Sequence, residues 1–247
     1  MHAKRSYSKD HQTTAHMITR GKLIVIEGID SSGKTTQLEL LKKYFTEENI
    51  PYKTVDFPQY ETSFYGKMIA RFLRGEFGPL EHVSPYIISV IYAQDRGSAK
   101  EQMYTWLDEG YHVLSNRYAT SSMAHQAGRL SIRERSKFVT WLEDLEYTQT
   151  GIPREDIVLY LDVPHHIAQK LMRNANRTQS YRKGAKKDMV EKNVEYLKQS
   201  SDTYTWLAKK FPHWVRIKST DKVNTMLPRE EIHEQIKKIL AKKDIIR

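Results

Sequence analysis

The chain has 247 residues, enough for one large α/β domain or two small ones. Its hydrophobic content of 39% is compatible with a full core. The chain has no cysteine, which excludes disulfides, thiolate metal sites and a cysteine nucleophile. The absence of cysteine also suits a reducing cytoplasm. No apolar run approaches the roughly 20 residues that span a bilayer. The formal charge of +10 is typical either of nucleic-acid binding or of a pocket for polyanionic small molecules.

The N-terminal segment 1–20 is polar, with scattered histidine, lysine and arginine and no apolar period. This composition predicts a disordered extension, and it lacks the apolar segment of a secretory signal. We therefore expect one domain over residues 21–247 that follows this extension.

A glycine-rich stretch fits the phosphate-binding pattern G-x-x-x-x-G-K-S/T. An apolar run at 22–27, typical of a buried parallel strand, precedes it, and leucines at helical spacing follow over 34–48. In this context the backbone N–H groups cradle phosphate oxygens, Lys34 reaches the outer phosphates, and the Thr35 hydroxyl can hold Mg²⁺. The residues expected to bind a nucleoside triphosphate are Gly28, Ser31, Ser32, Gly33, Lys34, Thr35 and Thr36.

Strands and helices alternate along the rest of the chain. Further strands are expected at 52–57, 111–116, 156–162 and 214–217. Further helices are expected at 64–73, 84–108 (capped by Ser84, with Pro85 first), 119–127, 131–147, 165–174, 188–210 and 229–242. This alternation predicts an α/β fold with a mostly parallel sheet covered on both faces, whose ligand site lies at the carboxyl ends of the strands.

Two aromatic motifs are placed near those strand ends. Pro58 and Tyr60 leave the second strand, and Tyr60 could offer a hydroxyl to a ligand, although a packed aromatic at an ordinary strand exit is the alternative. Tyr92 and Arg96 share a helix face and could stack on a base and bind its edge or a phosphate, although a surface cation is the alternative.

Polar side chains follow the strand at 111–116. Arg117 comes directly after it, where a guanidinium can hold a phosphate with two hydrogen bonds. Four polar residues on the next short helix are expected to face the same crevice: Ser121, Ser122, His125 and Gln126. The basic segment 173–187 is either a solvated run of charge or a lid that closes over phosphates.

These motifs, in this order and at these separations, resemble the thymidylate kinase family. The resemblance covers about residues 21–242. It rests on the phosphate loop with Asp30, the Phe57-Pro58 turn, Tyr92 with Asp95-Arg96, Arg117-Tyr118, Asp188-Met-Val-Glu191 and Tyr204. It implies the P-loop NTPase fold with a five-stranded parallel sheet flanked by helices, a basic helical lid, a homodimer, and Mg²⁺-dependent phosphoryl transfer from ATP to dTMP.

The resemblance also implies roles for the donor side. Lys34 and the loop amides hold the ATP phosphates, and Asp30 links the donor site to the acceptor. Asn116 departs from the family, which usually has an aspartate there, because an amide cannot carry a carboxylate's charge toward Mg²⁺. The expected metal residues are Thr35, Asp30, Asp188 and Glu191.

The same resemblance places the acceptor. Tyr60 and Arg117 hold its phosphate, and thymine stacks on Tyr92 with Arg96 at its edge. The base and sugar pocket is lined by Ser121, Ser122, His125 and Gln126, and Asp30 faces the sugar and phosphate of the acceptor. Phe57 and Pro58 are also expected to bind dTMP. His125 departs from the usual Tyr or Phe, which crowds the 2′ carbon and favours deoxyribose, and so leaves the choice of sugar open.

The phosphate loop also departs from one subclass of the family. Ser31 and Ser32 stand where some members have a catalytic arginine. We therefore expect the lid to supply the charge that stabilises the transferring phosphoryl group, with three candidates: Arg173, Arg177 and Arg182.

Two other functions stay open. A kinase of this fold could take another acceptor, such as dUMP, dGMP or a deoxynucleoside. A regulatory or nucleic-acid-binding protein that retains a phosphate loop would instead show salt-sensitive binding and no ADP release that depends on a monophosphate. A GTPase is disfavoured because the chain has no Asn-Lys-x-Asp guanine motif. We expect ATP and dTMP as partners, and neither a membrane nor nucleic acid.

Overall fold

The computed structural model describes residues 19–174 and 188–246, and the statements below refer to these residues. The predicted extension at 1–20 and the predicted lid at 173–187 lie almost wholly outside them. None of the helices in the described part of the chain is both long and apolar enough to cross a membrane.

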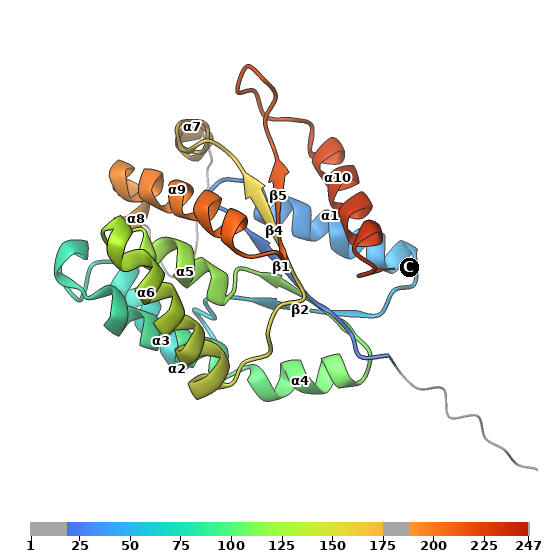
Figure 1. The fold of residues 1–247 in the computed structure, drawn as a ribbon, viewed down its shortest axis with the longest axis horizontal. Coiled ribbons are helices and arrows are strands. Elements are labelled where there is room, and N and C mark those ends of the chain that lie inside the picture. Colours follow the sequence, from blue (N-terminus) through green and yellow to red (C-terminus); the bar gives the residue numbers. More distant parts are fainter. Residues whose placement is uncertain (1–18, 175–187, 247) are drawn as a thin grey trace, which may run out of the picture.

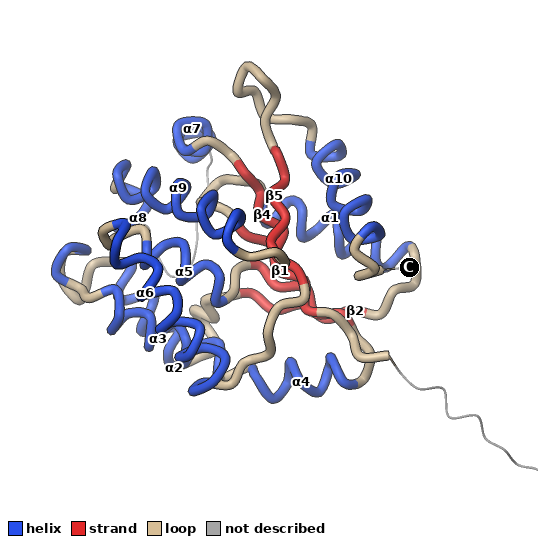
Figure 2. Tube along the Cα trace, in the orientation of Figure 1, coloured by secondary structure: helices blue, strands red, loops and turns tan. Residues whose placement is uncertain are grey.

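Within the described residues, five parallel strands form one sheet in the order β2-β3-β1-β4-β5, with helices on both faces (Figures 1 and 2). The strands are β1 (Leu23–Glu27), β2 (Tyr52–Asp56), β3 (His112–Asn116), β4 (Ile157–Asp162) and β5 (Trp214–Lys218). All residues of the central strand β1 are buried, as its apolar sequence predicts. The predicted α/β fold with a five-stranded parallel sheet is confirmed.

Helices fill the segments between the strands. They are α1 (Lys34–Glu47), α2 (Phe64–Leu73), α3 (Pro85–Gly97), α4 (Lys100–Asp108), α5 (Ala119–Ala127), α6 (Ile132–Glu143), α7 (His165–Asn174), α8 (Met189–Lys192), α9 (Val194–Lys210) and α10 (Arg229–Lys242). A 3-10 turn, η1 (Leu80–His82), follows α2, and a π-helical segment, η2 (Asp144–Thr150), follows α6.

The two faces of β1 serve different cores, because successive side chains of a strand point in opposite directions. Leu23 and Val25 pack with residues of α4, α5, α6 and α9. Ile24 and Ile26 pack with α1 and α10, which lie together on the other side of the sheet (Figure 1). The sheet is therefore packed between two layers of helices, and loops lie at the carboxyl ends of its strands.

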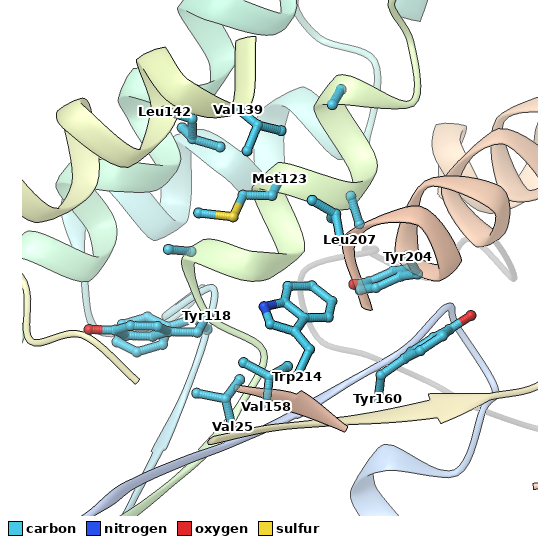
Figure 3. Close-up of a cluster of buried hydrophobic side chains, with 14 of the residues drawn as sticks. Val25, Tyr118, Met123, Val139, Leu142, Val158, Tyr160, Tyr204, Leu207 and Trp214 are labelled. Carbon is cyan, nitrogen blue, oxygen red and sulfur yellow. The ribbon is translucent and has the colours of Figure 1, made fainter. Parts of the chain in front are cut away.

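The core that contains Leu23 and Val25 also holds Tyr204 in a fixed position (Figure 3). Tyr204 of α9 stacks on Tyr160 of β4 with ring centroids 5.2 Å apart, and Trp214 of β5 packs beside it. Tyr204 is fully buried, so the position of its hydroxyl is set by the core rather than by solvent.

The helix predicted over 84–108 is wrong as one element, since it forms α3 and α4. The Ser98 hydroxyl donates to the Asp95 carbonyl oxygen at 2.7 Å, and the Ala99 N–H bonds to the Arg96 carbonyl oxygen instead of to Asp95. The helical bond from residue 99 to residue 95 is therefore replaced, and the helix ends there.

Two other helix predictions need correction. The segment 188–210 forms α8 and α9, because the Asn193 side chain accepts from the Tyr196 N–H at 3.0 Å and caps a new helix. The segment 131–147 passes from α6 into the π-helical η2. Ser84 precedes α3 as predicted, but its side chain makes no capping hydrogen bond.

Candidate active site

The turn between β1 and α1 has the backbone that its glycine pattern predicts. Gly28, Ser31 and Gly33 have φ angles of +145°, +64° and +97°. A Cβ at Gly28 would lie 2.9 Å from the Leu161 carbonyl oxygen, so a larger residue there would force the loop to move. Lys34 begins α1, and its Nζ donates to the Gly28 carbonyl oxygen at 2.9 Å. The N-terminus of α1 thus faces the loop in the arrangement that binds phosphate.

A pocket of about 350 Å³ lies at the carboxyl ends of β1, β2 and β3. Twelve residues predicted for the acceptor or the metal line it: Asp30, Thr35, Phe57, Pro58, Tyr60, Tyr92, Arg117, Ser121, Ser122, His125, Gln126 and Asp188. The wall is completed by Asp56, Leu73, Asn116, Val190 and Tyr196. The structure therefore gathers the three constellations that the sequence placed at separate strand ends.

Arg117 lies between the phosphate loop and this pocket. Its guanidinium pairs with the Asp30 carboxylate, and its Nη1 lies 3.3 Å from the Ser121 hydroxyl. Burial alone would lower the pKa of Arg117, but Asp30 and weaker negative neighbours raise it well above its ordinary value, so its charge is secure. Its φ of +64° is unusual for a residue with a side chain, a strain that is typical of functional positions.

His125 is held as a neutral ring. Because a guanidinium can only donate, the His125 Nε2 accepts from Arg117 at 3.3 Å, and Nδ1 carries the proton that it donates to the Ser200 hydroxyl at 3.2 Å. Burial, and then the positive charges of Arg117 and Lys34, lower the pKa of His125 to about 3. The ring also stacks on Tyr196, with centroids 5.6 Å apart.

A buried carboxylate organises the acceptor loop. Glu27, the last residue of β1, is fully buried and accepts hydrogen bonds from the Tyr118 N–H at 3.0 Å and from three hydroxyls at 2.7 Å, those of Thr120, Ser121 and Tyr204. Four donors satisfy an otherwise costly buried charge. Glu27 thereby ties β1 to both α5 and α9. Sequence reasoning missed this role, although an acidic residue at the end of an apolar strand was its visible signal.

Comparison with known proteins agrees with this geometry. The sequence model of the family described as thymidylate kinase matches residues 26–236. The Plasmodium falciparum thymidylate kinase is 30% identical over 223 residues, 90% of this chain and 91% of that protein. The Prochlorococcus marinus thymidylate kinase is 32% identical over 231 residues, 91% and 100%. A solved structure of Candida albicans thymidylate kinase matches the fold with a TM-score of 0.70 and 19% identity, over 92% of this chain and 93% of that one.

The chain belongs to the thymidylate kinase family. The resemblance that the motifs indicated is thus confirmed over most of the chain. The roles of individual residues remain predictions, and the geometry refines several of them.

Arg96 is placed differently from what the family resemblance implies. Its guanidinium does not line the pocket but lies behind it, 2% exposed and paired with the fully buried Glu146 of η2. Its Nη2 donates to the Ser122 hydroxyl at 3.0 Å, and Ser122 does line the pocket. In this family member, Arg96 therefore acts on the pocket through Ser122. Glu146 was not predicted, because no local pattern marks a partner 50 residues away.

The turn after β2 is held by the same helix. The Asp95 carboxylate accepts from the Gln59 N–H at 3.0 Å, and the Gln59 side-chain amide donates to the Asp95 carbonyl oxygen at 2.8 Å. These two bonds fix the turn in which the Phe57–Pro58 peptide bond is cis. The turn carries Tyr60 into the pocket wall. Asp95 therefore positions the turn that carries Tyr60.

The donor set fits a magnesium ion that shares its ligands with substrate. Asp30, Asp188 and Thr35 bring two carboxylates and a hydroxyl to one pocket, and the buried Asn116 Oδ1 has no hydrogen-bond partner within the described residues. Those residues contain no group of three or more His, Asp or Glu that could hold a metal alone. Mg²⁺ usually keeps several waters and binds through one or two carboxylates and substrate phosphates, so this set suits it.

Four predicted residues fall at or beyond the limit of the described residues. Arg173 lies in the last turn of α7 and is exposed. Arg177 and Arg182 lie outside the described residues, as does the side chain of Glu191.

Proposed function

We propose that this chain transfers the γ-phosphoryl group of ATP to dTMP and releases ADP and dTDP. The observation that carries the proposal is the pairing of Asp30, in the phosphate loop, with Arg117, in the acceptor loop, at one shared pocket. A monophosphate held by Arg117 would lie next to the ATP phosphates. Membership of the thymidylate kinase family supports this donor and this acceptor.

The reaction needs positioning and charge rather than a dedicated base. An oxygen of the dTMP phosphate attacks the γ-phosphorus in line, and the bond from the γ-phosphorus to its bridging oxygen breaks as ADP leaves. A phosphate monoester is largely ionised near neutral pH, so the attacking oxygen carries no proton that must be removed. Lys34 and Arg117 provide fixed positive charge at the two phosphates.

Mg²⁺, when bound, would supply positive charge that offsets the negative charge developing on the transferred group. We assign Thr35, Asp30 and Asp188 to its site, with Glu191 as a further candidate. The lid arginines remain candidates for the same task. Replacing Arg177 or Arg182 by Ala is expected to lower kcat by about 10³–10⁵ while dTMP binding changes little. Arg173→Ala tests the third candidate in the same way, and equal single-turnover rates would remove the lid from the mechanism.

The test is ADP and dTDP formation from ATP and Mg²⁺ with a panel of monophosphates: dTMP, dUMP, UMP, dCMP and dGMP. We expect dTMP to give the highest kcat/KM, with dTDP and ADP formed in equal amounts, and Lys34→Met to abolish both. ADP release that is independent of any monophosphate would contradict the proposal. Salt-sensitive DNA binding without turnover would favour the nucleic-acid alternative.

We further propose that the protein is a cytoplasmic homodimer. The support for a second copy is an exposed apolar row on α3, where Ile87 is 63% exposed and Tyr86 and Val90 are also open to solvent. Light scattering should give twice the chain mass, and Ile87→Glu should give the monomer. An exposed Lys67→Glu change on α2 is the control for added charge. Cell fractionation tests the location.

A further inference from the structure

Arg117 already uses part of its guanidinium within the protein. Its Nη2 pairs with the Asp30 carboxylate, and its Nη1 lies 3.3 Å from both the Ser121 hydroxyl oxygen and the His125 Nε2. The Arg117 Nε has no acceptor within the described residues. The phosphate of an acceptor nucleotide would therefore approach from the Nε side, and the groups that hold Nη1 help to decide where that side points.

A neutral His125 ring can accept from Arg117 in one tautomer only. Because a guanidinium has no acceptor, Nε2 must face it without a proton, and the ring then carries its proton on Nδ1. That proton points toward the hydroxyl oxygen of Ser200, 3.2 Å away on α9. Ser200 is fully buried, so water does not compete for the Nδ1 proton. The Ser200 oxygen thus favours the tautomer that can accept from Arg117.

Two tyrosines of α9 restrict the rotation of the same ring. Tyr196 stacks on His125 with ring centroids 5.6 Å apart and an angle of 17° between the planes. Tyr204 meets the ring edge-on, at 5.5 Å and 90°. Both tyrosines are at most 5% exposed. With one ring against its face and another at its edge, His125 keeps its two nitrogens directed at Arg117 and Ser200.

We propose that Ser200 is a positioning residue that sets, through the tautomer of His125, the orientation in which Arg117 receives the acceptor phosphate. This inference rests on the proposed function, because it takes Arg117 as the group that holds that phosphate. Ser200 is not among the residues that line the pocket, so its effect on a ligand must pass through other side chains. The usual Tyr or Phe at position 125 has no ring nitrogen, so this link follows from the chain's own histidine.

Loss of the Ser200 hydroxyl should weaken the hold on Arg117 but not abolish it. In Ser200→Ala the buried Nδ1 proton has lost its acceptor, which is a costly state. A ring that keeps this proton would tilt toward another acceptor, and a ring that moves it to Nε2 would set a donor against the guanidinium. Because Ser121 still lies beside Nη1, part of the orientation of Arg117 should survive.

Binding calorimetry with dTMP and with thymidine isolates the phosphate, since the two ligands share base and sugar. We expect Ser200→Ala to lower the affinity for dTMP about three- to tenfold and to leave the affinity for thymidine within about twofold of wild type. Ser201→Ala is the matched control. Ser201 is the next residue of α9 and is also buried, but its hydroxyl has no hydrogen bond in the part of the chain that the structure describes. This change should alter neither affinity.

A double-mutant cycle tests whether Ser200 acts through His125. In the His125→Phe background the ring has no nitrogen, so the further change Ser200→Ala should leave the ratio of dTMP to thymidine affinity unchanged. His125→Gln offers an acceptor and a donor on one planar amide, so it should keep a ratio closer to wild type than His125→Phe does. A merely structural serine would lower the affinity for both ligands, and would do so in either background.

The same measurements separate this inference from the proposed function. An unchanged ratio in Ser200→Ala, with wild type still binding dTMP more tightly than thymidine, would overturn the role of Ser200 and leave the kinase proposal standing. A loss shared equally by dTMP and thymidine would also overturn it, because the effect would then lie in the sugar pocket or the fold. If wild type showed no preference for dTMP over thymidine, Arg117 would not hold the phosphate, and both proposals would fail.

Discussion

The hydroxyl of Tyr204 donates to the Glu27 carboxylate at 2.7 Å, which joins α9 to the end of β1 across 177 residues of sequence. Both side chains are fully buried. The same carboxylate accepts hydrogen bonds from the Tyr118 N–H and the Ser121 hydroxyl, one and four residues after Arg117. The acceptor loop is therefore positioned from inside the core, which keeps the strained Arg117 backbone in place.

Tyr204→Phe should lower the free energy of unfolding by about 1–3 kcal/mol, because it removes one donor from a buried charge that water cannot reach. It should also raise the KM for dTMP, since the acceptor loop loses an anchor. Urea denaturation and steady-state kinetics measure the two effects. Tyr52→Phe is the control, because the one partner of the Tyr52 hydroxyl among the described residues is the exposed Thr46 hydroxyl. This change should alter stability by less than about 0.5 kcal/mol. Equal losses in both variants would contradict this role of Glu27.

Glu146→Gln should destabilise the fold by about 3–5 kcal/mol, because it leaves the Arg96 guanidinium charged, buried and unmatched. The paired change Glu143→Gln removes a partner of Arg154 whose side chain is 62% exposed, and it should cost less than about 1 kcal/mol. Urea denaturation of both variants gives the comparison. Equal losses of the free energy of unfolding in the two variants would show that the buried Arg96–Glu146 pair is no more important for stability than the exposed pair.

His125 should make stability depend on pH. Its folded pKa, about 3, is below the ordinary 6.5, so below pH 6.5 the unfolded chain binds a proton that the folded chain does not. Stability is therefore lost as the pH falls, by up to about 2 kcal/mol between pH 6.5 and 5, since each unit is worth about 1.36 kcal/mol. His125→Gln should remove this part of the slope in urea denaturation, while His112 and His233, whose pKa values are also lowered, keep theirs. Identical slopes in wild type and variant would count against a neutral His125.

Asn116→Asp should strengthen the metal site. The Asn116 amide donates to Asp56 at 3.0 Å, where β2 and β3 end side by side. Asp56 is exposed and lines the pocket. Partial desolvation raises the pKa of its carboxyl group, and Arg117, Asn116 and Lys34 offset part of that rise. A second carboxylate should lower the Mg²⁺ concentration for half-maximal rate a few-fold. Without Mg²⁺ the variant should lose about 1–3 kcal/mol of stability, because it puts two carboxylates in contact and one of the oxygens at position 116 is buried.

The double variant Asp56→Asn/Asn116→Asp moves the single carboxylate instead of adding one. It keeps the wild-type net charge, and its Mg²⁺ dependence shows whether a carboxylate at position 56 or at position 116 contributes more to metal binding. Titration with Mn²⁺ by electron paramagnetic resonance, in the presence of ADP and dTMP, reads metal binding apart from turnover. Unchanged metal affinity in both variants would remove positions 56 and 116 from the metal site.

Local pattern was enough to predict the elements whose ends are marked by their own residues. α5 and α10 were predicted with the observed bounds, and α10 follows Pro228 as expected. The break between α3 and α4 was missed, because it depends on a serine hydroxyl that replaces a helical hydrogen bond. Neither helix propensity nor hydrophobic periodicity predicts that the Ser98 hydroxyl will take the place of a backbone N–H at the Asp95 carbonyl oxygen.

In the candidate site, too, features marked by local sequence were predicted and features that depend on distant contacts were not. Twelve of the residues that line the pocket were predicted, most of them because they follow the end of a strand or a turn marked by Gly or Pro, whereas Leu73, Val190 and Tyr196 were not. The residues that hold them in place were not predicted, since the partners of Glu27 and Glu146 are distant in the sequence. Arg96 illustrates the difference: the motif placed it at the base, but its distant partner draws it behind Ser122.

The most direct test of the central claim is a crystal structure with dTMP, Mg²⁺ and a non-hydrolysable ATP analogue. The account predicts the dTMP phosphate within hydrogen-bond distance of Arg117 and the base against Tyr92. A dTMP molecule bound outside this pocket, or one with its base beside the phosphate loop, would contradict it.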